Sequence, residues 1–202
     1  YLGRDFSNLE VMNFLKSESL LNKFSYEYFE SDELLYKFAA KLISEGNVIG
    51  WFQGKMEFGP RALGNRSILA DPRNPNMKNI INMKIKRRES FRPFAPSVLK
   101  EFQNTWFNSN FTNPYMSSLA EVKNEKKNLI PAVTHIDGTA RLQSVDLENN
   151  NRYATLIKYF NLLTGVPILL NTSFNENEPI VMNPKEATAC LLRTDMDALF
   201  IN

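Results

Sequence analysis

The sequence has little of several residue types on which common functional sites depend. A single cysteine, Cys190, excludes an intramolecular disulfide framework and any metal site built from several cysteines, which fits a reducing compartment. The only histidine, His135, likewise excludes the usual zinc triads. No apolar run approaches the roughly 20 residues that a membrane-spanning helix needs, and the first residues do not form a secretion signal. We therefore expect a cytoplasmic protein without a membrane span.

The chain also has little net charge. Its 24 Lys and Arg residues stand against 22 Asp and Glu residues, which gives +2 and no global field to attract a polyanion. Any affinity for phosphate or nucleic acid must therefore come from a local cluster of cations. With 202 residues, 43% of them hydrophobic, the chain can bury the core of one domain with an extension.

Helical and strand patterns alternate along most of the chain. Apolar stripes at helical spacing, opened by capping residues or stopped by a glycine, predict helices. Short apolar runs between turn residues predict strands. The expected helices are 32–43, 75–83, 153–163 and 184–192, and the expected strands are 48–52, 94–99, 141–145, 166–170 and 197–201. This alternation predicts an α/β domain with a mixed or partly parallel sheet. We expect residues 1–30 to form a connecting arm and residues 101–130 a surface excursion.

The most informative segment is the run 54–73, which follows the predicted strand 48–52. It holds three glycines, two prolines and four cations, with little uninterrupted apolar surface. Glycines let the backbone approach a ligand, and guanidinium groups match the planar shape of phosphate or carboxylate oxygens. The run predicts an anion-binding loop, with Arg61 and Arg66 as its ligand contacts.

Three further polar clusters lie next to predicted strands, at 84–92, 135–141 and 171–175. The first has five cations in nine residues, and the last follows a strand end, where ligands of open α/β sheets commonly bind. If the clusters converge, they offer guanidinium, ammonium, hydroxyl and amide groups without an obvious nucleophile–base pair. That inventory suits phosphoryl or acyl-phosphate chemistry. Taken singly, the basic run also fits a solvated surface, and His135 a structural role.

The same clusters resemble the C-terminal domain of the nodulation-factor and antibiotic O-carbamoyltransferase family. The similar stretches are 56–73, 86–96, 131–141 and 164–175, in that order. The resemblance implies a YrdC-like fold, a twisted mixed sheet with flanking helices and a basic concave face, over residues 31–202. It also implies an N-terminal domain of the actin/sugar-kinase type, absent from this chain, that transfers a carbamoyl group to an acceptor hydroxyl.

In that family the C-terminal domain makes carbamoyl-adenylate from carbamoyl phosphate and ATP. The resemblance therefore implies ATP as co-substrate, with Mg²⁺ carried largely by its phosphates and no metal-ligating residues in the chain. By motif, the residues expected to carry the chemistry are Arg61, Lys86, Arg141 and Ser173. Those expected to bind substrate or nucleotide are Arg66, Arg88, Asn171, Asn175 and His135. The family signatures Lys-x-Arg and Ser-x-Asn match Lys86 with Arg88 and Ser173 with Asn175.

Two other functions are compatible with these residues. The chain could be an RNA- or nucleotide-binding YrdC-like module without catalysis of its own, using the run 84–92 on a basic face. Its small net charge counts against binding a long polyanion. A degenerate interaction domain that kept the fold and lost its chemistry is the third reading. The acceptor hydroxyl cannot be read from the sequence.

Overall fold

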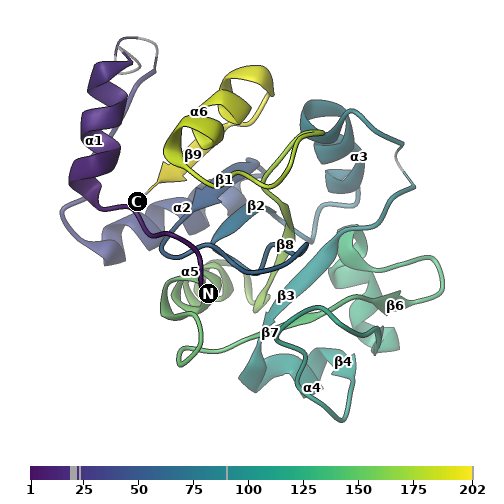
Figure 1. Ribbon diagram of the computed structural model, residues 1–202. Coiled ribbons are helices and arrows are strands. Elements are labelled where there is room, and N and C mark those ends of the chain that lie inside the picture. Colours follow the sequence, from purple (N-terminus) through teal and green to yellow (C-terminus); the bar gives the residue numbers. More distant parts are fainter. Residues whose placement is uncertain (19–21, 23, 90, 202) are drawn as a thin grey trace.

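The computed structural model of the protein describes residues 1–18, 22, 24–89 and 91–201, and its centre is a six-stranded sheet (Figure 1). The strands lie in the order β7-β3-β8-β2-β1-β9. Their bounds are β1 (Ile49–Phe52), β2 (Arg66–Ala70), β3 (Ala95–Leu99), β7 (Gln143–Val145), β8 (Ile168–Ser173) and β9 (Ala198–Ile201). The pairs β1–β9 and β3–β7 are parallel, and the other pairs are antiparallel. The predicted mixed α/β sheet is therefore confirmed.

Helices cover both faces of this sheet (Figure 1). On one face, α2 (Asp32–Ser44) and α5 (Asn151–Thr164) pack against each other, and α6 (Pro184–Arg193) and α3 (Met77–Ile81) lie over the other. Local sequence fixes their ends, since the Ser31 hydroxyl accepts the Leu34 N–H at 3.3 Å and Gly165 ends α5 at φ 73°. None of the helices in these described stretches is long and apolar enough to cross a membrane.

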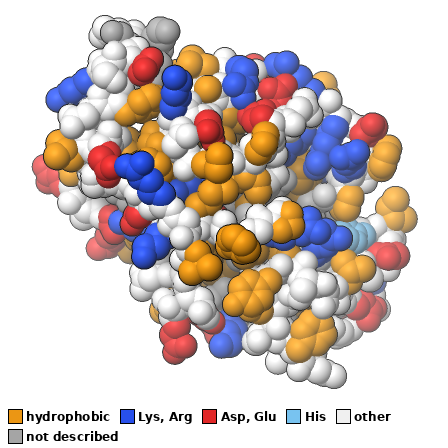
Figure 2. Space-filling view, viewed as in Figure 1, with side chains coloured by type: hydrophobic (Ala, Val, Ile, Leu, Met, Phe, Trp, Pro, Cys, Tyr) orange, Lys and Arg blue, Asp and Glu red, His pale blue; other side chains and the backbone are white. Residues whose placement is uncertain are grey.

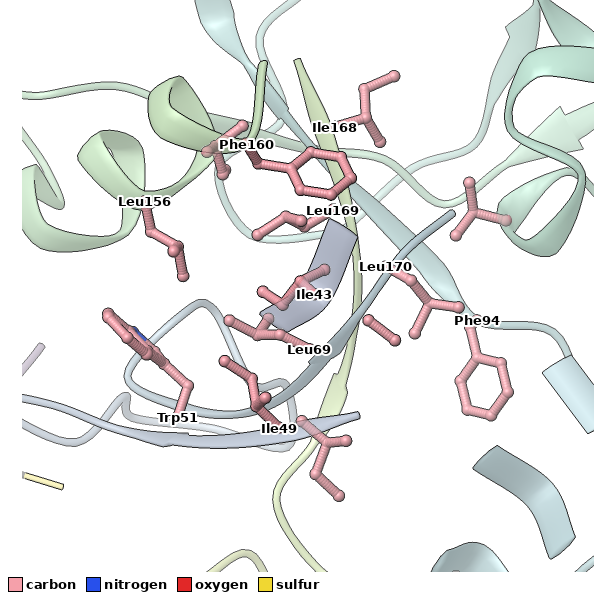
Figure 3. Close-up of a cluster of buried hydrophobic side chains, with 14 of the residues drawn as sticks. Ile43, Ile49, Trp51, Leu69, Phe94, Leu156, Phe160, Ile168, Leu169 and Leu170 are labelled. Carbon is pink, nitrogen blue, oxygen red and sulfur yellow. The ribbon is translucent and has the colours of Figure 1, made fainter. Parts of the chain in front are cut away.

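The hydrophobic core lies between the sheet and its helices (Figure 3). Trp51, Leu69 and Leu169 from the strands are fully buried with Ile43 of α2 and Phe160 of α5. Strand positions 168–170 are buried in succession, as expected for a central strand covered on both faces. Because this core fixes the strand register, it also fixes which polar residues emerge at each end of the sheet.

The segment 101–130 is better packed than a surface excursion. It contains α4 (Gln103–Trp106) and the strands β4 (Phe107–Asn108) and β5 (Ala120–Val122), which pair with β6 (Thr139–Ala140) in a small antiparallel sheet. Short 3₁₀ turns at Lys100–Phe102, Asn124–Leu129 and Pro131–Val133 connect these pieces. Trp106 and Phe107 belong to the main hydrophobic core, although the polar composition around them conceals this in the sequence.

The N-terminal arm contains a helix that its irregular pattern did not predict. Helix α1 (Asn8–Ser17) begins with a capping box, in which Ser7 and Glu10 each bind the other's backbone N–H. The arm packs by its aromatic side chains, as expected, with the rings of Phe6 and Phe52 5.9 Å apart. Residues 19–21 and 23 of the arm lie outside the described part of the chain.

Two boundaries differ from the prediction, and both concern the site. The run 54–73 is not one loop, since its second half forms β2 and the loop proper covers 53–65. Strand β8 continues through Ser173, although the polar residues after 170 suggested a loop. In both cases the polar side chains lie in the sheet because neighbouring strands satisfy their backbone groups on both sides.

Candidate functional site

The strand directions bring all four polar clusters to the same end of the sheet. Strand β8 is antiparallel to both β2 and β3, with Ser67 opposite Ser173 and Ala95 opposite Asn171. Strand β7 runs parallel to β3. The starts of β2, β3 and β7 and the end of β8 therefore coincide. We call this region, residues 53–65, 84–94, 135–142 and 173–178, the polar end of the sheet.

Lys86 is the most deeply buried cation of the polar end, since only 2% of its surface is exposed. Helix α3 continues as a π-helical turn, Asn82–Lys86, and ends at Arg87, whose left-handed backbone (φ 43°) turns the chain away. The Lys86 ammonium donates to the Ser173 and Asn175 carbonyls, both at 2.7 Å, and to the Asn175 amide oxygen at 2.8 Å. These contacts join the 84–94 segment to the end of β8.

Two features of the surroundings of Lys86 have opposite effects on its charge. Burial and, secondarily, the positive charge of Arg88 lower the pKa of Lys86 to about 7. The three oxygen acceptors around Nζ suit its charged form, because an ammonium has three N–H groups to donate. An anion placed beside Lys86 would offset the burial and favour the charged form.

Lys86 faces a cavity of about 460 Å³ at the polar end. Its walls come from the segment after α3 and from the turn that follows β8. The lining residues are Lys86, Arg87, Arg88, Glu89, Arg92, Ser173, Asn175, Glu176 and Asn177. In Figure 2, Lys and Arg side chains gather on the side where α3 and the following segment lie, with acidic side chains beside them. The cavity is therefore polar and contains four cations.

Neighbouring groups hold the cations of this cavity in place. The Arg88 Nε donates to the Asn82 side-chain oxygen at 2.9 Å, and its guanidinium lies 5.2 Å from the Phe94 ring centre. Burial lowers the pKa of Arg88, and the nearby Arg92 adds to the effect. At the rim, Glu176 pairs with Arg87 at 3.2 Å. This pairing offsets only part of the positive charge.

The 53–65 loop presents Arg61 on the surface while its backbone is held tightly. One oxygen of the buried Glu57 carboxylate accepts the N–H groups of Leu63, Asn65 and Arg66, at 2.7, 2.8 and 3.2 Å. Gly59, with φ 122°, takes a backbone conformation that a side chain would strain. The loop therefore has one defined shape with an exposed Arg61 at its turn.

Arg66 has a structural role, which corrects the prediction that it contacts a ligand. It is fully buried, and its guanidinium donates to the carbonyls of Gln53, Asn65 and Gly54 at 2.9 Å and of Arg4 at 3.3 Å. Burial lowers the pKa of Arg66 to about 10. The sequence could not show this, because a guanidinium serves backbone carbonyls as readily as phosphate oxygens.

Asn171 also lies inside the sheet rather than on the cavity wall. It is 1% exposed, and its amide nitrogen donates to the Ala62 carbonyl at 3.2 Å and to the Ser97 hydroxyl at 3.1 Å. The prediction that Asn171 binds substrate is thus replaced by a position beneath the 53–65 loop. Strand β8 places the side chains of Ser173 and Asn171 two residues apart on the same face, which links that loop to the cavity.

His135 and Arg141 lie on the third segment of the polar end. The His135 Nδ1 is 3.1 Å from the Thr139 hydroxyl, and its backbone N–H donates to the Thr139 carbonyl at 2.8 Å. Burial lowers the pKa of His135, and the charges of Lys78 and Arg141 act in the same direction, while Asp137 opposes them. Figure 2 shows the pale-blue histidine beside blue cationic side chains. Arg141 is exposed two residues before the start of β7.

The structure thus brings together some of the predicted site residues more closely than others. Lys86, Arg88, Ser173 and Asn175 line one cavity. Arg61, Arg141 and His135 lie on neighbouring segments of the polar end. Sequence reasoning missed five lining residues, Arg87, Glu89, Arg92, Glu176 and Asn177. The density of cations in 84–92 was a signal for the two arginines, whereas no such signal marked Glu89, Glu176 and Asn177. Ser90 of that run lies outside the described residues.

The acidic side chains at the cavity are paired with arginines. Over the residues that the structure describes, no group of three or more His, Cys, Asp or Glu side chains is arranged to hold an ion. Glu89 and Glu176 face the cavity, but each pairs with an arginine, Arg92 at 3.4 Å and Arg87 at 3.2 Å.

Comparison with known proteins identifies the family. The model of the carbamoyltransferase C-terminus matches residues 40–202. The nodulation protein NolNO of Sinorhizobium fredii is 54% identical over 167 residues, which cover 81% of this chain and 25% of that protein. The nodulation protein NolO of Bradyrhizobium diazoefficiens is 45% identical over 207 residues, covering all of this chain and 37% of that protein. The chain therefore spans less than two fifths of the length of these relatives.

A solved structure supports the fold. Full-length HypF, crystallised in a phosphate- and nucleotide-bound form, superposes on 84% of this chain and 21% of its own length. The TM-score is 0.53 at 19% sequence identity, so this similarity concerns the fold alone. The sequence matches are much closer and cover the polar end in full. This chain belongs to the carbamoyltransferase C-terminus family.

Proposed function

We propose that this chain activates a carbamoyl group with ATP, as the C-terminal domain of an O-carbamoyltransferase. The observation that carries the proposal is the cavity in which the buried Lys86 and the arginines around it face the end of β8. A site whose four cations outnumber its two carboxylates, with a hydroxyl and amide wall, suits a triphosphate better than a neutral ligand. The family to which the chain belongs supplies the carbamoyl group as the substrate class.

In the proposed reaction, carbamoyl phosphate is hydrolysed to carbamate and phosphate. A carbamate oxygen then attacks the α-phosphorus of ATP, the bond from that phosphorus to the bridging oxygen breaks, and pyrophosphate leaves. The product is carbamoyl-adenylate. The carbamate anion must approach the polyanionic ATP, so cations at their junction lower the electrostatic barrier. The nucleotide-bound form of the HypF structure, which shares the fold, is consistent with ATP as co-substrate.

Seven of the nine predicted residues have a role in this scheme, whereas Arg66 and Asn171 are buried and support the 53–65 loop. Lys86 and Arg88 neutralise the triphosphate, and Ser173 and Asn175 hydrogen-bond the adenylate. Arg61 and Arg141 clamp phosphate oxygens from the two adjoining segments, with His135 beside Arg141 as a further substrate contact. Mg²⁺ enters with ATP and is carried by its phosphates, since the described residues offer no ligand cluster.

A further domain completes the transfer. NolNO and NolO extend well beyond the part that this chain matches, which fits an N-terminal actin/sugar-kinase-like domain in the whole protein. That domain would bind the acceptor hydroxyl and receive carbamoyl-adenylate. The basic face and the cytoplasmic location expected from the sequence belong to the same proposal.

Pyrophosphate release in the presence of ATP, Mg²⁺ and carbamoyl phosphate tests the proposal. We expect Lys86→Met to reduce the rate at least 100-fold. Lys84→Met is the matched control, because Lys84 lies on the same π-helical turn but pairs with Asp197 at 3.3 Å. Its rate should stay within about twofold of the unchanged chain, since a half-exposed ion pair contributes little. Equal rates for Lys86→Met and Lys84→Met would contradict the proposal.

A further inference from the structure

Two buried amide side chains lie directly beneath the loop that carries Arg61. The Gln143 amide nitrogen donates to the Leu63 carbonyl at 2.9 Å, and the Asn171 amide nitrogen donates to the Ala62 carbonyl at 3.2 Å. Both side chains are at most 2% exposed. The two carbonyls follow Arg61 immediately in the chain. Strands β7 and β8 therefore hold the backbone next to Arg61 from below.

The two amides are also fixed relative to each other. The Asn171 amide nitrogen donates to the Gln143 side-chain oxygen at 3.1 Å, and the Ser97 hydroxyl donates to the same oxygen at 2.7 Å. The Gln143 oxygen accepts two hydrogen bonds and its nitrogen donates to Leu63, so rotating this amide would break all three. The Asn171 side-chain oxygen is buried without a partner, which leaves Gln143 as the more fully satisfied of the two amides. The nitrogen of Gln143 that reaches Leu63 is consequently held in one place.

Hydrogen bonds to Glu57 also hold the loop from its other side. The Glu57 carboxylate accepts the backbone N–H groups of Leu63 and Asn65, while the Gln143 amide nitrogen donates to the Leu63 carbonyl. Residues 62–66 are thus anchored on two sides, and the Arg61 side chain projects from this anchored turn into solvent. Gln143 also follows Arg141 by two residues, so one side chain connects the two segments that carry exposed arginines.

We propose that Gln143 and Asn171 are positioning residues, which hold Arg61 in register with Arg141 for an anionic substrate. The proposal rests on the proposed function, because it assumes that Arg61 contacts phosphate oxygens. Anchoring the loop before the substrate arrives removes the cost of ordering it during binding. Neither amide needs to touch the substrate itself.

Gln143→Met tests the proposal, since methionine keeps the length of the side chain and removes the amide. We expect the KM for carbamoyl phosphate in the pyrophosphate-release assay to rise about five- to tenfold, the loss typical of about one hydrogen bond. Gln103→Met is the matched control. Gln103 is also buried, at 4% exposed; its amide nitrogen donates to the Phe111 carbonyl at 2.8 Å and its side-chain oxygen accepts the Ser144 hydroxyl, so these two bonds go to residues outside the polar end. Its KM should stay within about twofold.

A double-mutant cycle with Arg61→Ala separates positioning from general damage. If Gln143 acts through Arg61, Gln143→Met should change the KM less than about twofold once Arg61 is removed. Amide hydrogen exchange over residues 62–66 should also accelerate in Gln143→Met and not in Gln103→Met. Should Gln143→Met fail to fold, Asn171→Ser enters the same cycle.

The outcomes distinguish the two proposals. If Arg61→Ala raises the KM and Gln143→Met raises it by the same factor with and without Arg61, positioning is overturned while the proposed function stands. If Gln143→Met leaves the KM unchanged, positioning is likewise overturned. If Arg61→Ala itself leaves the KM unchanged, the role proposed for Arg61 fails, and the positioning proposal fails with it.

Discussion

Replacing Arg66 by methionine tests whether this arginine supports the 53–65 loop or binds a ligand. Its guanidinium donates to the carbonyls of Gln53, Asn65, Gly54 and Arg4 and lies 3.7 Å from the centre of the Phe52 ring. Methionine fills much of the volume but leaves these buried carbonyls without donors. The loss of four hydrogen bonds is partly offset because the buried charge, which was costly, is also removed.

We expect Arg66→Met to lower the free energy of unfolding by about 3–5 kcal/mol, as an unsatisfied buried polar group costs about 1–3 kcal/mol and some carbonyls regain water. For a chain of this size, that corresponds to a decrease of roughly 10 °C in melting temperature. Thermal unfolding followed by circular dichroism measures it. Residual ATP binding by the folded fraction should be weakened only to the extent that the loop is disordered.

Arg92→Met provides the reciprocal control. Arg92 lines the cavity, and its side chain, 55% exposed, pairs with Glu89 on the surface. We expect its removal to change the free energy of unfolding by less than about 0.5 kcal/mol, because exposed ion pairs contribute little, while ATP binding weakens. If Arg66→Met keeps the melting temperature within about 2 °C and loses ATP binding, Arg66 is a ligand contact and our reasoning is wrong.

Two further predictions concern Lys86 and Gly64. Since the pKa of Lys86 is lowered to about 7, the free side chain is mostly neutral at pH 8, and a bound phosphate should raise that pKa. ATP binding at pH 8 should therefore take up protons, at most one per site, and affinity should fall as the pH rises above 7. Calorimetry in buffers of different ionisation enthalpy measures the uptake, which Lys86→Arg should abolish; unchanged uptake in that variant would exclude Lys86 as its source. Gly64→Ala should destabilise the chain by about 2–4 kcal/mol, because at φ 104° its Cβ would lie 2.1 Å from the Tyr153 ring. Gly46→Ala, also at positive φ but in open space, should cost only about 1 kcal/mol; equal losses in denaturant titrations would contradict the clash.

The sequence was sufficient for the elements whose boundaries are encoded locally. Helix α2 begins at its Ser31 cap, and α5 ends at Gly165, as the residues predict. Helix α1 was missed although its capping box is present in the sequence, because the mixed aromatic pattern around it has no clear period. Strand β2 was missed because its first residues are polar, and only pairing with β1 and β8 makes them part of a sheet.

Some residues of the candidate site could be identified from the sequence, and others could not. The Lys-x-Arg and Ser-x-Asn pairs were identified from sequence, and the structure places all four residues around one cavity. Residue type alone could not separate Arg61, which is exposed, from Arg66, which is buried five residues later. Only the positions of backbone carbonyls decide which guanidinium is already satisfied. The same holds for Asn171, whose amide is used inside the sheet.

The most direct test of the central claim is a calorimetric titration of the chain with ATP and Mg²⁺, with and without carbamoyl phosphate. We predict micromolar-range binding that Lys86→Met or Arg141→Ala weakens at least tenfold and that Lys84→Met leaves within about twofold. Binding of equal strength in all four proteins, or no heat with either ligand, would contradict the assignment of the polar end of the sheet as the nucleotide and carbamoyl-phosphate site.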